Sequence, residues 1–192
     1  MLRAVRIHGR PSPARDALAR LAAADGVAVF VDVDPATLVA APLASLSEDE
    51  WDARAEAPAR ALLGWLQDVR PALGAGGLAV VVVPHVSLEG AAGLVATTTG
   101  IEAVRLLAKS AARRWAPAGV RVNLVAALPQ AFGASADDVG PDALRTASPL
   151  PFPSAEACAS AVADAVALLA RPEARHLTGA TVTLDGGALM LP

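Results

Sequence analysis

The sequence predicts an α/β fold, a single domain in which helices cover both faces of a parallel sheet. Two observations lead to this prediction. Short apolar runs rich in valine alternate along the chain with longer alanine-rich segments of helical periodicity. The 192 residues, 54% of them hydrophobic, are enough to bury one core, so we expect residues 1–192 to form one domain.

The chain begins with a strand, a helix and a second strand. Ala4–His8 is short and strand-like. Ala14–Ala24 has apolar residues on one helical face, and Asp25-Gly26 is a typical helix end. Val27–Val31 is a continuous apolar run between turn residues, which is typical of a strand buried on both faces.

A long helix is expected from Glu48 to about Leu73. Ser47 and Glu50 have the spacing of a capping box, in which each side chain bonds to the other residue's backbone N–H. Pro58 lies inside this segment, where it removes a helical hydrogen bond. We therefore predict a helix that is kinked or split at Pro58.

The second half continues the alternation of strands and helices. The pattern predicts strands at 78–83, 120–126 and 181–184, and helices at 97–115 and 154–169. The segment 130–153 is polar and rich in glycine and proline, which favours a mobile loop.

Composition excludes several classes of function. The net charge of −3 gives no reason to expect binding to nucleic acid or to an anionic membrane surface. No apolar run approaches the ~18 residues of a membrane span, and the N-terminus lacks a signal-peptide pattern, so we expect a cytoplasmic protein. The one cysteine, Cys158, excludes an internal disulfide, and no Cys/His cluster has the spacing of a metal site.

Three segments carry a family pattern. They are Ala-Pro-Ala-Gly-Val-Arg-Val-Asn-Leu-Val at 116–125, Thr-Gly-Ala-Thr-Val-Thr-Leu-Asp-Gly-Gly at 178–187, and the stretch from Ala41 to Asp52. In this order the segments resemble those of the short-chain dehydrogenases/reductases. The resemblance implies a Rossmann-like fold, a nicotinamide cofactor and hydride transfer.

The same resemblance implies an active site of Asn, Ser, Tyr and Lys, with Tyr as general acid/base. Counted from the motifs, these positions fall on Pro58, near Pro84, and on Thr97 and Ile101, and the chain contains no tyrosine at all. The hydroxyl of Thr97 is a poor proton donor near neutral pH, because its pKa lies far above the ~10 of a phenol. We therefore expect this chemistry to be lost or replaced.

The expected cofactor turn also departs from the family's Thr-Gly-x-x-x-Gly-x-Gly. In His8–Arg15 only Gly9 remains, and Pro13 removes a backbone donor. Arg10 and Arg15 are weak candidates for binding a phosphate, with solvated arginines as the alternative. We expect no cofactor, with NAD(P) kept as a weaker possibility.

The first part of the chain is also short for the family. The strand after Gly26 leads directly toward Pro42-Leu43, which implies that one strand–helix–strand unit is missing. By the resemblance, that is the unit that normally contacts the adenosine ribose. Its absence predicts a single Rossmann-like domain with a reduced parallel sheet of about five to six strands.

Another candidate site is the pair His85 and Ser87, which follows a strand. With Thr97 they could line a cleft for acyl transfer or proton abstraction, but no nucleophile-elbow motif is present. A histidine in a loop without catalytic function is the alternative for His85.

Three hypotheses follow. The first is a catalytically degenerate family member that acts as a structural or regulatory subunit. By resemblance it would form a homo-oligomer, or a hetero-oligomer with an active homologue, through the helices around 48–73 and 97–115. The second is a cofactor-independent lyase, isomerase or cyclase that uses His85, Ser87 and Thr97. The third is an NAD(P)-dependent oxidoreductase whose site is atypical or completed by a partner.

Overall fold

A computed structural model describes residues 5–21, 26–88, 90–140 and 148–189, and it contains one five-stranded parallel sheet. The strands lie side by side in chain order, which places β3 at the centre of the sheet. They are β1 (Arg6–His8), β2 (Val27–Phe30), β3 (Leu78–Pro84), β4 (Arg121–Ala127) and β5 (Thr181–Leu184). The predicted α/β class and reduced parallel sheet are confirmed.

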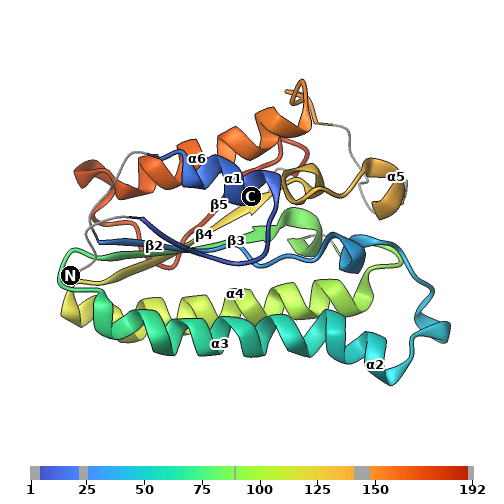
Figure 1. Ribbon diagram of the computed structural model, residues 1–192, viewed down its shortest axis with the longest axis horizontal. Coiled ribbons are helices and arrows are strands. Elements are labelled where there is room, and N and C mark those ends of the chain that lie inside the picture. Colours follow the sequence, from blue (N-terminus) through green and yellow to red (C-terminus); the bar gives the residue numbers. More distant parts are fainter. Residues whose placement is uncertain (1–4, 22–25, 89, 141–147, 190–192) are drawn as a thin grey trace.

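Helices cover both faces of the sheet (Figure 1). One layer consists of α1 (Pro13–Ala19) packed against α6 (Ala155–Ala170). The other contains α2 (Glu48–Trp51), α3 (Ala57–Val69) and α4 (Val95–Trp115). No described helix is both long and apolar enough to cross a membrane.

The order of the strands restricts the connections between them. In a parallel sheet whose strands step in one direction, right-handed crossovers would place every helix on the same face. Here α1 and α6 lie on one face and α3 and α4 on the other. Two of the four connections therefore have the opposite hand to the other two. The order also never reverses, so the sheet lacks the switch point where doubly wound folds form their crevice.

The core forms on both sides of the central strands. Every residue of β2 and β3 is buried, as the continuous apolar runs predict. Trp65 of α3 is also buried, with its ring 5.4 Å from that of Phe30. Trp65 is therefore a core residue and not the interface anchor that its size alone would permit.

Several predicted boundaries change. The capping box of Ser47 and Glu50 is present, but the helix expected at 48–73 is divided into α2, a π-helical segment Asp52–Glu56 and α3, with Pro58 in the first turn of α3. The helical run continues through Pro58, so the predicted kink or split is represented only by the π-helical segment just before it. Pro58 itself lies in the first turn of α3, where no N–H is needed.

The helix expected at 97–115 begins two residues earlier, at Val95. The segment expected to be a loop contains the single turns Pro129–Phe132 and α5 (Ala136–Val139). Within it, residues 141–147 lie outside the described residues, as do residues 22–25 of the first predicted helix.

Buried polar groups hold the last third of the chain to the sheet. Asn123 of β4 is fully buried, and its side chain donates to Leu177 O (2.9 Å) and accepts from Ala180 N (3.1 Å). Beside it, Arg121 donates to Leu169 O at the end of α6 and to Ala174 O in the turn Pro172–Ala174 that follows. Two of the three family-like segments therefore serve the fold, because their side chains join β4 to the segment before β5.

We predict that Asn123→Ala lowers the free energy of unfolding by about 1–3 kcal/mol, since it removes the two hydrogen bonds from a fully buried side chain to Leu177 and Ala180. Urea unfolding followed by circular dichroism measures this change. Ser160→Ala, at an exposed position of α6, is the control and should change stability little. A loss below about 0.5 kcal/mol for Asn123→Ala would show that these bonds do not hold the C-terminal segment.

Candidate functional site

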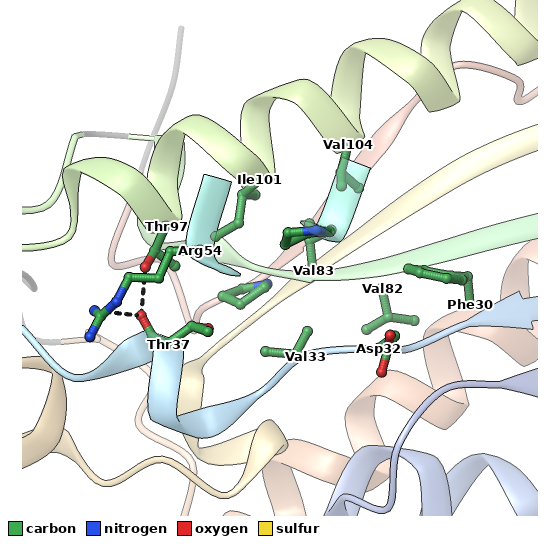
Figure 2. Close-up of a pocket in the computed structure, with 12 residues that line it drawn as sticks. Phe30, Asp32, Val33, Thr37, Arg54, Val82, Val83, Thr97, Ile101 and Val104 are labelled. Atoms are coloured by element: carbon green, nitrogen blue, oxygen red, sulfur yellow. Dashed lines mark hydrogen bonds between the residues drawn. The ribbon is translucent and has the colours of Figure 1, made fainter. Parts of the chain in front are cut away.

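A small cavity lies beside the carboxyl ends of β2 and β3, between the sheet and the helices α3 and α4 (Figure 2). Its volume is about 40 Å³. Small-molecule sites usually have roughly 300–1,000 Å³, so this cavity has room for water but not for a nicotinamide ring. It is lined by Phe30, Asp32, Val33, Thr37, Arg54, Pro58, Val82, Val83, Pro84, Thr97, Ile101 and Val104.

The four positions that the family resemblance assigns to catalysis all line this cavity. They come from three elements, with Pro58 in α3, Pro84 at the end of β3, and Thr97 and Ile101 one turn apart in α4. Three of these four side chains have no polar atom. The only functional group at these positions is the hydroxyl of Thr97.

That hydroxyl already has a hydrogen-bond partner. Thr97 Oγ1 donates to the backbone carbonyl of Thr37 in the segment between β2 and α2. Arg54 donates to the same carbonyl (3.3 Å) and to Val39 O (2.8 Å), as Figure 2 shows in part. Thr97 and Arg54 therefore hold the segment around Thr37 against the helices, and the proton of Thr97 is engaged in that contact.

His85 and Ser87 lie elsewhere, in the single turn His85–Leu88 that follows β3. Both side chains are buried, and neither lines the cavity around Thr97. The hydroxyl of Ser87 has no hydrogen-bond partner among the described residues. The cavity thus brings together Thr97 and the apolar positions, and not the three side chains of the second hypothesis.

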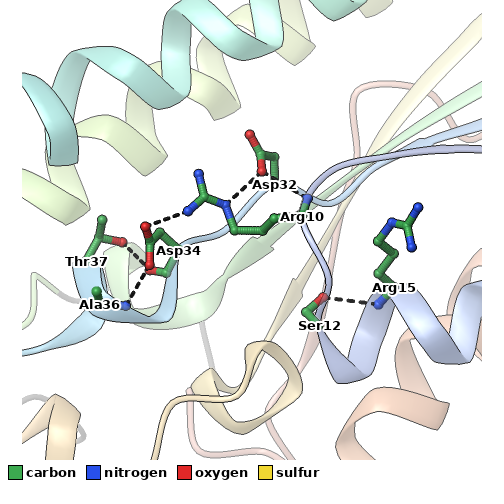
Figure 3. Close-up of polar contacts among 7 residues, drawn as sticks. All are labelled: Arg10, Ser12, Arg15, Asp32, Asp34, Ala36 and Thr37. Atoms are coloured by element: carbon green, nitrogen blue, oxygen red, sulfur yellow. Dashed lines mark hydrogen bonds and ion pairs between the residues drawn. The ribbon is translucent and has the colours of Figure 1, made fainter.

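The turn after β1 contains the three candidate phosphate-binding residues. Gly9 has a φ of 136°, and a Cβ at this position would lie 2.0 Å from Val31 O, so only glycine fits against the end of β2. Arg10 does not face an open anion site. Its Nε donates to Asp32 Oδ1 (3.0 Å) and its Nη1 pairs with Asp34 Oδ2 (Figure 3).

The contacts with Asp32 and Asp34 make Arg10 unsuited to binding a phosphate. The hydrogen bond to Asp32 raises the pKa of Arg10, with the charge of Asp34 acting in the same direction. Two carboxylates surround one guanidinium, so the local charge opposes a phosphate rather than attracting it. Asp34 also accepts from Ala36 N at the start of the turn Pro35–Leu38. Both acids therefore have structural partners at the strand end.

The rest of the turn is occupied by helix capping. The hydroxyl of Ser12 accepts from Arg15 N (3.2 Å), and Pro13 begins α1 (Figure 3). Arg15 makes no ion pair with a described carboxylate. The residues present do not fit a nicotinamide dinucleotide, because the first turn is short of free N–H groups and the cavity is too small. Among the described residues no cluster could hold a metal ion.

The sequence as a whole matches a family model. The model described as enoyl-(acyl carrier protein) reductase covers residues 14–188. The chain belongs to the short-chain dehydrogenase/reductase family. No protein of curated function matches its sequence at a significant level.

Solved structures of short-chain dehydrogenases/reductases share the fold. A short-chain dehydrogenase/reductase from Brucella melitensis superposes with a TM-score of 0.76 at 16% identity, over 100% of this chain and 98% of that one. A blue fluorescent protein from a metagenomic library, in complex with NADPH, gives 0.75 at 18% identity over 98% and 99% of the two chains. A dehydrogenase/reductase from Sinorhizobium meliloti 1021 gives a TM-score of 0.68 at 24% identity. The match covers 85% of this chain but only 64% of that one.

The close packing of α4 on the π-helical segment suggests a stability test. A Cβ on Gly100 would lie 2.4 Å from Arg54 O and 2.9 Å from Ala55 O. We predict that Gly100→Ala costs about 1–3 kcal/mol, because these backbones must separate. The matched control Gly64→Ala, in α3 with nothing within 4 Å, should stabilise by about 0.5–1 kcal/mol. Urea unfolding of both variants checks this, and equal effects would refute the close contact.

Proposed function

We propose that this chain does not transfer hydride by the family's tyrosine–lysine chemistry and acts as a structural or regulatory subunit. One observation carries the proposal. The four positions implied by resemblance converge on one cavity of about 40 Å³, and there they are Pro58, Pro84, Thr97 and Ile101. Because the four positions converge, their assignment to the family's catalytic set is supported. The residue types found there can therefore be compared with what the reaction requires.

The identities leave the reaction without a proton donor. Reduction of a carbonyl needs a proton at the developing alkoxide, from a group with a pKa near the working pH. Thr97 has an aliphatic hydroxyl, and Ile101 brings no positive charge that would lower its pKa. The first turn adds an independent argument, since Arg10 is paired with Asp32 and Asp34. The blue fluorescent protein from the metagenomic library is in complex with NADPH, whereas we expect no such binding by this chain.

We predict that NAD(H) and NADP(H) up to millimolar concentration leave the melting temperature unchanged. A ligand that binds only the native state raises apparent stability by mass action, so binding would be visible as a shift. Differential scanning fluorimetry measures it, with AMP as a control for binding through adenosine alone. A saturable shift with any of the four dinucleotides would contradict the proposal and restore the oxidoreductase hypothesis.

The surface of α3 and α4 supports a role in assembly. A shallow groove of about 480 Å³ runs between the two helices, with Leu63, Leu107 and Trp115 in its lining. Leu63 is 45% exposed, and Leu106 beside the groove is 65% exposed. Arg70 stacks over the ring of Trp115 at 5.6 Å. Exposed apolar residues next to an aromatic are typical of a face that becomes buried on association.

The charges on this face favour a second copy of the chain as the partner. Exposed acids predominate where α2 leads into α3, although Arg60 pairs there with Glu56, and bases predominate where α3 and α4 end, although Asp68 also lies there. The acids are Glu48, Asp49, Glu50, Asp52 and Glu56, and the bases are Arg70, Lys109, Arg113 and Arg114. Because α3 and α4 run in the same direction, a two-fold axis would set the acidic end of one copy against the basic end of the other.

We predict that the protein is a dimer in solution and that Leu63→Glu/Leu106→Glu makes it monomeric, since two buried charges would lie in the interface. Light scattering coupled to size-exclusion chromatography gives the mass. Leu168→Glu, at a 56% exposed position of α6, is the control and should remain dimeric. A monomeric wild-type chain, or a double variant that is still dimeric, would contradict this use of the face.

A further inference from the structure

A second concavity lies at the opposite edge of the sheet, where β3, β4 and β5 begin. Its volume is about 550 Å³, within the roughly 300–1,000 Å³ of small-molecule sites. The ends of α4 and α6, which cover opposite faces of the sheet, form its walls. It shares no lining residue with the cavity around Thr97.

The lining of this concavity is basic although the whole chain has a net charge of −3. Arg121, Arg171 and Arg175 line it together with His176, and no described Asp or Glu does. Of these residues only Arg121 lies in a family-like segment, and it bonds to the end of α6. Arg171 and Arg175 follow α6 and have no comparable part in the fold.

Arg121 is the fixed member of the group. Its Nη1 donates to Leu169 O (2.9 Å) and Ala174 O (3.0 Å), which holds the guanidinium in place. Burial lowers the pKa of Arg121, but an arginine remains protonated in proteins. No described carboxylate lies within 4.0 Å of it. A partly buried cation without a counter-ion is unfavourable, so an anion would be stabilised there.

The other two arginines are free to turn toward a ligand. Arg171 Nε lies 3.5 Å from Glu173 Oε2, but both side chains are mostly exposed, and such a surface pair contributes little. Arg175 makes only a long contact of 3.5 Å to Pro172 O. The ends of α4 and α6 bring some negative charge to this edge, and Nη1 of Arg121 already bonds to the carbonyl of Leu169 there.

We propose that this concavity binds a phosphate-bearing small molecule. Arg121 would fix one phosphate, and Arg171 and Arg175 would close over it, because planar guanidinium groups match phosphate oxygens with paired hydrogen bonds. The proposal does not depend on the role of the chain as a subunit. It also differs from the family's cofactor turn, which lies at the other edge of the sheet.

Calorimetric titration with inorganic pyrophosphate at low ionic strength tests the proposal. We expect saturable binding that weakens with salt and is at least about tenfold weaker in Arg171→Gln/Arg175→Gln. The matched control Arg6→Gln/Arg20→Gln removes the same charge from exposed positions of the first strand and helix and should bind like the wild type.

Two further arms distinguish the source of any signal. Arg10→Gln should leave the affinity unchanged, and a loss there would place the anion at the first turn and overturn the proposal. Citrate should bind at least about tenfold more weakly than pyrophosphate, because carboxylates carry less charge per group. Equal affinity for citrate, no binding by the wild type, or equal weakening in both double variants would each overturn the assignment.

Discussion

Asn123, in the middle of β4, makes the hydrogen bonds on which the C-terminal third of the fold depends. It is fully buried and joins its strand to Leu177 and Ala180, which lead into β5. The bonds continue outward, as Thr178 Oγ1 accepts from Val122 N and Gly179 N donates to Val122 O. Asp185 then accepts from Gly187 N and Leu189 N, and so orders the turn after β5. Because Val122, Asn123 and Asp185 are buried, their polar groups cannot exchange these partners for water, so they are constrained whatever the chain does chemically.

This constraint separates the part of the family pattern that serves the fold from the part that serves catalysis. The motifs at 116–125 and 178–187 hold β4, β5 and α6 together, and they match the family closely. At two of the positions that the resemblance assigns to catalysis, Pro58 and Ile101, apolar side chains line the cavity. At a third, Thr97 bonds to the segment around Thr37. The chain therefore has the fold of the family, while Thr97 and Arg54 at the carboxyl edge of the sheet bond to backbone carbonyls.

Local patterns in the sequence predict the fold well. The runs at 27–31 and 78–83 are buried strands because a strand covered on both faces must be apolar throughout, and Ser47 with Glu50 caps a helix because the spacing allows only that exchange. The sequence pattern does not distinguish the π-helical segment before α3 from ordinary helix, and the close approach of this segment to Gly100 of α4 is a contact between residues far apart in the chain. The roles of Arg54 and Asp32 were also hidden, because their partners are 15 to 22 residues away in the chain. The basic concavity joins Arg121 to Arg171 and Arg175, which only the tertiary structure brings together.

The two edges of the sheet differ in how their charged side chains are paired. At the carboxyl edge, Arg10 is neutralised by two acids, and the donors of Thr97 and Arg54 are bonded to backbone carbonyls. The charge of Arg10 is therefore not available to an anionic ligand. At the amino edge, Arg121 is held in place without a described counter-ion, beside two exposed arginines. In a parallel α/β sheet the carboxyl edge is the usual place for ligands, because helix N-termini and strand-end loops face it. Here α1 has only seven residues and begins with Ser12 bonded to its own helix, so that advantage is lost. Unpaired positive charge therefore lies at the amino edge, and an anionic ligand of this protein would be stabilised there.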